Sequence, residues 1–400
     1  MRTIVIVFFV ALLVRLLALA YFLPKLNADV DLDSYRSLGR SLVAGKGFVA
    51  PSADGRVLPT IGRTPVYPLF IAGLIQVGGD RLGLFLAMQC VLGAATCALT
   101  VVLARRWLSP AAAAAAGLLV AFDPNSVVRC VDLRTETLFT LLLVAGAVAL
   151  LRRTKDRRSW LTAGVLWSLA ALTRPIAVWL WLLVVPAAFV WRARPAGVLV
   201  FLAGYLVVLG VWTGRNAILT GRPFVSTIAT YNLLMYRAAA MEAQHTSVTL
   251  EAVQTRWREQ FGDLLWFHDR AGFEDQLRQY RQMARQVIGS DPMLAARQAI
   301  AGVGKSLFGP GAHSLAGSLR EPLLSPVWWP RLYAAALVVA FGLAAFGAWR
   351  LRREALLPVA LALYFLLLAG GPEANSRFRT PITPMLAVLA VAAFTRTEKR

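Results

Sequence analysis

Residues 4–35 read IVIVFFVALLVRLLALAYFLPKLNADVDLDSY, an apolar run followed at once by an acidic segment. An α-helix needs about 20 apolar residues to cross the roughly 30 Å hydrocarbon core of a bilayer, and Ile4–Leu23 supplies that length. The run lacks a small-residue cleavage site, so we expect a retained membrane helix and not a signal peptide. Arg15 lies inside the run, where a charge is costly, so we expect it to have a structural partner in a helix bundle.

The acidic segment holds three alternating carboxylates, Asp29, Asp31 and Asp33, followed by Tyr35. Carboxylates are scarce in this chain, which has 21 Asp and Glu against 42 Lys and Arg. Repulsion among the three raises the pKa of at least one of them unless cations or a metal lie opposite. The segment is either a solvated turn or part of a site, and its position at a membrane exit favours a site.

The composition predicts the class of protein. Hydrophobic residues make up 58% of the 400 residues, which is typical of a polytopic membrane protein. A formal net charge of +21 is also common in nucleic-acid-binding proteins. Here, however, the basic residues cluster between apolar runs, where they act as topology signals, so we exclude a nucleic-acid partner. Three cysteines are too few for a disulfide framework.

Basic residues flank a series of ten apolar runs. If the N-terminus lies in the cytoplasm and every run crosses once, the short basic segments, such as 152–158 and 350–353, all become cytoplasmic. The positive-inside rule requires this placement. We therefore expect an all-α polytopic membrane protein of about ten transmembrane helices with both ends in the cytoplasm. The runs are Ile4–Leu23, Leu82–Ala104, Ala111–Phe122, Leu138–Leu151, Trp160–Leu172, Ile176–Val190, Ala196–Trp212, Leu332–Trp349, Ala355–Ala369 and Ile382–Phe394.

Two further segments bear on this count. Val66–Gly78 is apolar, but at about 1.5 Å per residue it is too short to cross the bilayer. We expect it to be an amphipathic helix that lies in the outer interface or dips partway into the bilayer. Trp160–Val190 is interrupted by Thr173-Arg174-Pro175, which favours a tight hairpin with Arg174 at the outer surface.

This topology divides the chain into three parts. Residues 1–213 are expected to form a membrane catalytic module that includes an outer loop over 24–81. Residues 214–331 are expected to form an extracytoplasmic segment, in which amphipathic patterns predict a small helical cap. Residues 332–400 hold the last three membrane helices.

The same topology collects charged residues on the outer face. Arginine there opposes the usual sign bias, so its repeated presence indicates an anionic partner. A guanidinium group donates two parallel hydrogen bonds to a phosphate and stays charged when partly desolvated. A neighbouring carboxylate can take a proton from an attacking hydroxyl while the arginines stabilise a departing phosphate. The candidates are Asp31, Asp33, Glu136, Arg174, Arg215, Arg377 and Arg379, with Tyr35, Arg63 and Tyr67 as further substrate-binding residues.

Several candidates also have a structural interpretation. Arg377 and Arg379 can bind lipid headgroups. Glu136 can complement a helix dipole. Arg174 and Arg215 can anchor their helices at the interface with extended side chains. The sequence contains no P-loop, no Rossmann glycine signature and no HExxH motif, so neither nucleotide nor zinc-protease chemistry is indicated.

Short motifs follow one another through almost the whole chain. They are Asp31–Tyr35 (DLDSY), Leu42–Phe48 (LVAGKGF), Arg63–Phe70 (RTPVYPLF), Thr135–Phe139 (TETLF), Ala171–Pro175 (ALTRP), Arg215-Asn216 and Arg377–Pro384 (RFRTPITP). This ordered set resembles the C-type integral-membrane glycosyltransferases. Within that superfamily it is most similar to the group of protein O-mannosyltransferases and the lipid A aminoarabinose transferase.

The resemblance implies an undecaprenyl- or other polyprenyl-phosphate sugar donor, a bacterial inner-membrane location, an extracytoplasmic active site and inversion at the anomeric carbon. The catalytic acid of the family stands four residues before the tyrosine, which corresponds to Asp31, and Asp33 is an added acid. Glu136 matches the second acidic position, and Arg377 and Arg379 match the late basic motif. The shorter chain favours a lipid, glycan or small acceptor over a large folded protein.

These observations predict a hexosyl- or pentosyltransferase. In it, Asp31 is the base and Asp33 or Glu136 orients a substrate. Arg215, Arg377 and Arg379 hold the phosphate. A divalent metal is an open alternative because carboxylates cluster, although arginines alone can neutralise a monophosphate. A transporter or flippase for an anionic or lipid-linked substrate is the main rival, and a non-catalytic assembly subunit is a second.

Overall fold

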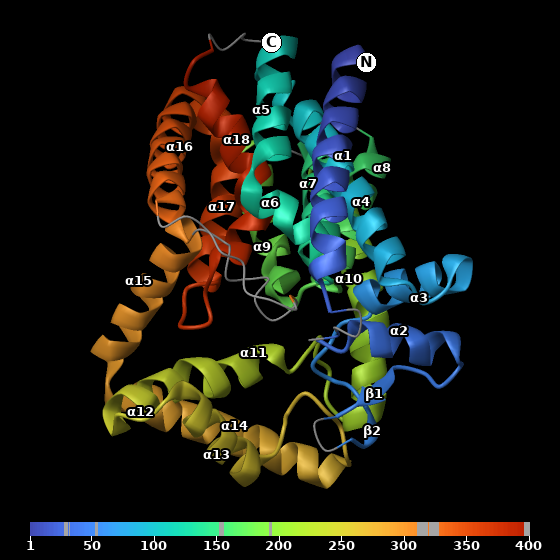
Figure 1. Cartoon of the computed structure of the whole chain (residues 1–400), viewed down its shortest axis with the longest axis vertical. Helices are drawn as coiled ribbons and strands as arrows, with labels where there is room; N and C mark the ends of the chain where they lie inside the picture. The colour runs from blue at the N-terminus through green and yellow to red at the C-terminus, as the bar shows by residue number, and fades with distance from the viewer. Residues whose placement is uncertain are drawn as a thin grey trace.

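The computed structural model describes residues 1–27, 31, 33–52, 55–151, 156–191, 194–309, 319 and 328–395. Asp29, one of the three predicted acidic residues, lies outside the described residues. The chain forms a bundle of long helices with a layer of shorter helices beneath it (Figure 1). The first helix begins, and the last helix (Thr383–Ala392) ends, at the end of the bundle opposite this layer.

All ten predicted apolar runs are helical. Among the described residues, four helices are long and apolar enough to cross a membrane, or five if the pair Pro110–Phe122 and Pro124–Val131, bent by 56°, counts as one span. The protein is therefore an all-α polytopic membrane protein, whereas ten crossings remain a prediction. The bundle helices are α1 (Arg2–Phe22), α4 (Leu82–Ala104), α5 (Pro110–Phe122), α7 (Glu136–Leu151), α8 (Arg157–Ala171), α9 (Trp181–Val190), α10 (Pro195–Thr220), α16 (Trp329–Leu351), α17 (Leu356–Leu368) and α18 (Thr383–Ala392).

Arg15 has a structural partner inside the bundle. Its side chain is buried, and Nη1 donates to the carbonyl oxygens of Ala11 and Ala121 at 3.1 and 3.3 Å. Nη2 donates to the carbonyl of Val120 at 3.4 Å. Helix α5 ends before Asp123-Pro124, so its last carbonyls lack partners within the helix. The arginine satisfies them and places a positive charge at the negative end of the helix dipole.

The first outer loop crosses the lower end of the bundle. It contains η1 (Leu23–Lys25), α2 (Tyr35–Val43), the antiparallel strands β1 (Val49–Pro51) and β2 (Val57–Pro59), and α3 (Val66–Gly78). Figure 1 shows α3 lying across the bundle axis and extending beyond it. Two apolar side chains of this helix are exposed, Leu69 by 53% and Val77 by 88%. This arrangement suits the interfacial position that the sequence predicts.

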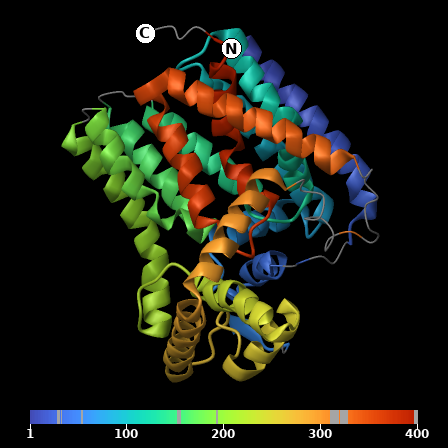
Figure 2. The same cartoon turned by 90° about the vertical axis from the view of Figure 1, so that its left-hand side faces the viewer.

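The lower layer, here called the cap, is made of helices. They are α11 (Ile228–Asn232), the π-helical segment η4 (Leu233–Ala238), α12 (Ala239–Thr246), α13 (Leu250–Phe261), α14 (Arg270–Ser290) and α15 (Pro292–Phe308). Figures 1 and 2 show α11 to α14 below the bundle and α15 returning to it. The remaining short segments, α6 (Pro124–Val128), η2 (Arg129–Val131), η3 (Pro175–Trp179), η6 (Arg352–Ala355) and η7 (Ser376–Ile382), connect bundle helices.

The first outer loop and the cap share one hydrophobic core. Ile61 of the loop is completely buried in a cluster with cap residues that include Leu264 and Trp266. The backbone N–H groups of Ile61 and Gly62 both donate to the carbonyl of Leu265, at 3.0 and 3.1 Å. A Cβ atom at Gly62 would overlap the Leu265 side chain. The two outer segments that the sequence assigns to different parts of the chain are thus packed together.

Glycines allow the closest helix contacts in the bundle. Helices α16 and α18 pack so closely at Gly347 that an added Cβ atom would overlap the carbonyl oxygen of Leu389. Small residues are typical of membrane helix interfaces because they let two backbones approach. Gly342 lies in the same helix, but an added Cβ atom there would meet nothing within 4 Å. The pair allows a matched test of this interface.

We expect Gly347→Ala to lower the thermal midpoint of the detergent-solubilised protein, since overpacking a tight interface costs about 1–3 kcal/mol. Gly342→Ala should leave it unchanged or raise it, because alanine is the better helix former by about 1 kcal/mol. Thermal unfolding of the two variants side by side checks this. Equal midpoints for the two variants would show that α16 and α18 do not pack as described.

Candidate functional site

Charged side chains meet where the bundle, the first outer loop and the cap come together. Asp33 lies just before α2, and its Oδ1 pairs with Nη2 of Arg63 at 2.9 Å. Its Oδ2 pairs with Nη1 of Arg134 at 3.2 Å. Arg134 also reaches Asp132 at 3.1 Å, and Asp132 pairs with Arg129 at 2.7 Å. A row of alternating charges therefore joins the first outer loop to the turn before α7.

The two carboxylates in this row have different electrostatic surroundings. Burial opposes the charged form of Asp33, but Arg63 and Arg134 outweigh it and hold the pKa of Asp33 below its ordinary value. Burial of Asp132 is nearly complete and raises its pKa despite Arg129 and Arg134. An acid with a lowered pKa is a weak proton acceptor at neutral pH, so Asp33 is better suited to orient a substrate than to act as a base.

Glu136 begins α7 and joins two more arginines to the site. Its carboxylate, only 1% exposed, contacts Nη1 of Arg174, and its Oε1 lies 3.9 Å from Nε of Arg377. Among the described residues, neither Oε2 of Glu136 nor Nε of Arg377 has a hydrogen-bond partner. Buried polar atoms without partners cost about 1–3 kcal/mol each, so they mark a place where a ligand or water completes the site.

Arg174 and Arg377 come from distant parts of the chain and converge on one ring. Arg174 lies in the turn between α8 and η3, and Arg377 lies in η7. Their guanidinium carbons lie 5.5 and 5.1 Å from the centre of the Phe378 ring. Two guanidinium groups held this way can grip one anion, since each can donate a pair of hydrogen bonds.

The two groups of charges act on each other. Besides burial, Arg63 and Arg134, the charges of Arg377 and Glu136 also influence the pKa of Asp33. Burial lowers the pKa of Arg377, the charges of Glu136 and Asp33 oppose this effect, and those of Arg174 and Arg134 add to it. Asp33, Glu136 and the arginines around them therefore belong to one site.

Asp31 has a different environment from Asp33. Its Oδ1 accepts a hydrogen bond from the backbone N–H of Arg36 at 2.9 Å. Its Oδ2 accepts from the N–H and the hydroxyl of Ser37, at 2.8 and 2.7 Å. These are free donors of the first turn of α2, which has Ser34 in the left-handed region as its N-cap. Asp31 therefore caps α2 and is held rigidly at the positive end of that helix.

The two candidate tyrosines contact each other edge to face, with ring centres 4.9 Å apart. Tyr35 lies at the site, where the guanidinium carbon of Arg63 is 5.5 Å from its ring centre. Tyr67 is completely buried and donates to Oε1 of Gln89 at 2.8 Å. Gln89 in turn donates to the carbonyl of Asp132 at 2.8 Å. Tyr67 thus supports the site from behind.

Arg215 contacts the backbone of the first outer loop. It lies in α10, and its Nη1 donates to the carbonyl of Thr60 at 3.1 Å and to Asn216 at 2.8 Å. Its guanidinium carbon is 4.9 Å from the ring centre of Trp212. Among the described residues, Arg215 forms no ion pair with Asp33 or Glu136, the carboxylates of the site. Its contacts favour a structural role.

Arg379 is 2% exposed and is occupied by the backbone. Its Nη1 donates to the carbonyls of Ser306 and Leu307, and its Nη2 donates to the carbonyl of Gly309 at 3.3 Å. These carbonyls lie at the C-terminal end of α15, where a cation is favoured. Arg379 therefore fixes α15 to η7, one residue beyond the Phe378 ring that Arg174 and Arg377 share.

Three residues of the site, Arg129, Asp132 and Arg134, are not among the candidates that the sequence indicates. Their only signal is a run of charges, RCVDLRTE over 129–136, placed directly before an apolar run. Glu136 was recognisable there because of its motif. The pairing of Arg134 with Asp33 joins residues 101 positions apart, which no local pattern indicates.

The carboxylates do not fit a divalent metal. Asp33 and Glu136 are engaged by arginines, and Asp31 by the N-terminus of α2. Throughout the described part of the chain, no group of three His, Cys, Asp or Glu side chains is arranged to hold a metal ion. The arginines around these carboxylates supply positive charge of the kind that binds an anion.

Comparison with known proteins relates part of the chain to a known family. Residues 62–214 match the family model of dolichyl-phosphate-mannose-protein mannosyltransferases. No curated protein matches the chain.

Several solved structures have a similar fold. An Archaeoglobus fulgidus oligosaccharyltransferase tethered with an acceptor peptide is 11% identical, with a TM-score of 0.58 over 97% of this chain and 49% of that one. The archaeal oligosaccharyltransferase AglB from the same organism, in complex with an inhibitory peptide and a dolichol-phosphate, is 12% identical, with a TM-score of 0.56 over 97% and 50%. ArnT from Cupriavidus metallidurans bound to undecaprenyl phosphate is 16% identical, with a TM-score of 0.45 over 97% and 76%.

The chain spans about half the length of the two oligosaccharyltransferase structures. At these identities the likeness concerns the fold. The match over residues 62–214 includes Glu136 and Arg174, and the fold likeness extends over nearly the whole chain. The resemblance to the C-type integral-membrane glycosyltransferases that the sequence predicts is therefore confirmed.

Proposed function

We propose that this protein transfers a sugar from a polyprenyl phosphate to an acceptor outside the cytoplasm. The observation that carries the proposal is the convergence of Arg174 and Arg377 on the buried Glu136, beside the ionised Asp33. Paired guanidinium groups next to carboxylates suit the displacement of a phosphate leaving group. The match of residues 62–214 to a family named for a lipid-linked sugar donor supports a donor of this general class.

The proposed orientation places the site on the extracytoplasmic face of a bacterial inner membrane. Helix α1 begins and helix α18 ends at the same end of the bundle, as ten crossings require, and the cap lies at the other (Figure 1). The basic segments between helices favour the cytoplasm for the end that holds the termini. We retain 1–213, 214–331 and 332–400 as the three parts of the chain, with the first outer loop packed on the cap.

In the proposed donor complex, the phosphate binds Arg377 and Arg174. The unpartnered Nε of Arg377 supplies a free donor for it. The polyprenyl chain extends into the bilayer beside the bundle. Arg134 and Arg63 hold Asp33 next to the sugar, and Arg215 and Arg379 position the first loop and η7.

The proposed reaction is a single inverting displacement. The acceptor hydroxyl attacks the anomeric carbon, the bond from that carbon to the phosphate oxygen breaks, and the phosphate leaves with the bonding electrons. Asp31 is the candidate base for the acceptor proton, held in place by α2. Asp33 and Glu136 orient the acceptor and the donor, and the arginines stabilise the charge that develops on the phosphate.

Lipids that co-purify with the protein test the donor site. We expect polyprenyl phosphate or its glycosylated form on the wild type and its loss in Arg377→Ala, because that change removes the guanidinium group whose Nε has no hydrogen-bond partner among the described residues. Mass spectrometry of extracted lipids measures this. Arg256→Ala is the control, since Arg256 pairs with Glu242 on the surface of the cap. Equal amounts of bulk phospholipid alone in all three proteins would refute the donor site and favour a transporter.

Replacement of the candidate base tests the chemistry. We expect Asp31→Asn to slow single-turnover release of polyprenyl phosphate from the bound donor by roughly 10²–10⁴-fold, as expected for loss of a general base. The reaction is started with an envelope extract as the acceptor and followed by mass spectrometry. Donor binding should persist, which separates a chemical defect from a folding defect. Full transfer activity in Asp31→Asn would exclude Asp31 as the base.

The ion pairs of Asp33 should depend on pH in a defined direction. The pKa of Asp33 is lowered in the folded protein, so the stability it contributes is present above the pKa of the unfolded chain and is lost as pH falls through the folded value. We therefore expect Asp33→Asn to lower the thermal midpoint equally at pH 8 and pH 6, and the difference from wild type to disappear only in stronger acid. Asp275→Asn, at an exposed pair with Arg278, should change little.

A further inference from the structure

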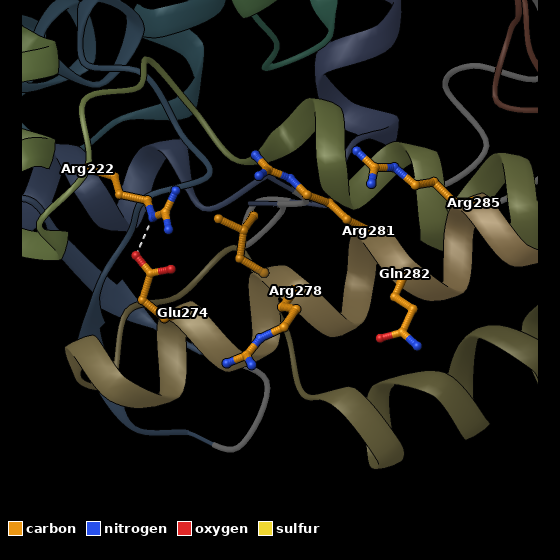
Figure 3. A pocket seen from close by; sticks show the side chains of 7 residues that line it. Arg222, Glu274, Arg278, Arg281, Gln282 and Arg285 are labelled. Atoms are coloured by element: carbon orange, nitrogen blue, oxygen red, sulfur yellow. Dashed lines mark hydrogen bonds and ion pairs between the residues drawn. The ribbon is translucent and has the colours of Figure 1, made fainter.

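The cap carries a second polar feature, a groove along α14 with a volume of about 660 Å³ (Figure 3). It is separate from the site described above, because none of its lining residues belongs to the network around Asp33 and Glu136. The lining residues are Arg222, Glu274, Leu277, Arg278, Arg281, Gln282 and Arg285. Four arginines against one glutamate leave a formal excess of three positive charges in the groove.

Two of the arginines lack an acidic partner among the described residues. Arg222 pairs with Glu274, and Arg278 lies 3.3 Å from Asp275. Arg281 and Arg285 are exposed and make no ion pair within the described chain. Figure 3 shows both side chains extending to the same side of α14. Like charges one turn apart disfavour a helix, so the fold itself does not benefit from this pair.

Arg270, near the groove, has the backbone contacts that are typical of a structural arginine. Arg270 at the start of α14 donates to the carbonyl of Ile218 at 2.6 Å and to that of Leu219 at 3.2 Å. It thereby satisfies the end of α10. Arg281 and Arg285 have no comparable backbone contacts among the hydrogen bonds of the described residues. Their guanidinium groups are free to bind a ligand.

The length of α10 places the groove outside the bilayer in the proposed orientation. Helix α10 has 26 residues and is about 39 Å long, which exceeds the roughly 30 Å hydrocarbon core. Arg222 follows the cap end of this helix, and α14 lies in the layer below the bundle (Figure 1). A ligand in the groove therefore approaches from the aqueous side and not from the lipid.

We propose that this groove binds the acceptor and that the acceptor is an acidic glycan carrying carboxylate or phosphate groups. The inference rests on the proposed function and adds the charge of the acceptor to it. Guanidinium groups form paired hydrogen bonds with both kinds of anion, and an open groove admits an extended chain. Attraction between opposite charges also speeds the association of such a ligand, and its affinity falls as the ionic strength rises.

The test uses the full chain in nanodiscs of uncharged lipid. The probes are polygalacturonate oligomers, polyphosphate and neutral dextran, and binding is followed by microscale thermophoresis at low salt. Arg281→Gln/Arg285→Gln removes the two free charges of the groove. Arg256→Gln/Arg297→Gln removes the same number of charges from two other cap helices and is the matched control.

We expect the wild type to bind at least one acidic probe and not dextran. The groove variant should bind that probe about tenfold more weakly or worse, since each charge-assisted hydrogen bond contributes substantially to affinity. The control variant should stay within about twofold of the wild type, because its arginines lie outside the groove. Equal loss in both variants, or no binding of either acidic probe to the wild type, would overturn the proposal.

Co-purified lipid separates this proposal from the proposed function. The groove variant should retain polyprenyl phosphate at the wild-type amount, because Arg377 and Arg174 are untouched. A wild type that holds the donor but binds no acidic probe would refute the acidic acceptor alone. A wild type without polyprenyl phosphate would refute the donor site. The probe measurements would then show only whether the groove binds polyanions.

Discussion

The organisation of the half of this protein that carries the cap depends on the pairing of buried carboxylates with arginines. Glu136 is almost completely buried and Asp33 is mostly buried, so an unpaired charge at either position would be unfavourable by several kcal/mol. Their partners come from the first outer loop, the turn before α7, the turn after α8 and η7. Satisfying two carboxylates therefore brings four separate segments of the chain to one place.

The arginines in and around the site fall into two groups by what they contact. Arg379 and Arg215 donate to backbone carbonyls and hold segments together. Arg174 and Arg377 face a carboxylate and share an aromatic ring, and one guanidinium nitrogen of Arg377 has no hydrogen-bond partner within the described residues. The first group sets the positions from which the second can act on a ligand. A sequence motif such as RFRTP thus combines one arginine that we propose binds the donor with one structural arginine.

Sequence patterns predicted the helices well because apolar length is a local property, and each of the ten runs forms a helix. The same patterns marked Asp33, Glu136, Arg174 and Arg377, since charges at membrane exits are rare enough to stand out. They did not separate Arg377 from Arg379, because the difference lies in where each side chain points. They also missed Arg134, whose partner Asp33 comes close only when the first outer loop folds onto the bundle.

The shared core of the first outer loop and the cap has a consequence for how such proteins can diverge. Ile61 and Gly62 are held by Leu265, and Arg63 follows them directly in the chain. A new cap introduced by recombination would bring a different surface to this segment of the loop and displace Arg63, and with it the carboxylate of Asp33. Caps and first loops must therefore be inherited together, so chimaeras that exchange only one of them would lose function even when both parents are active.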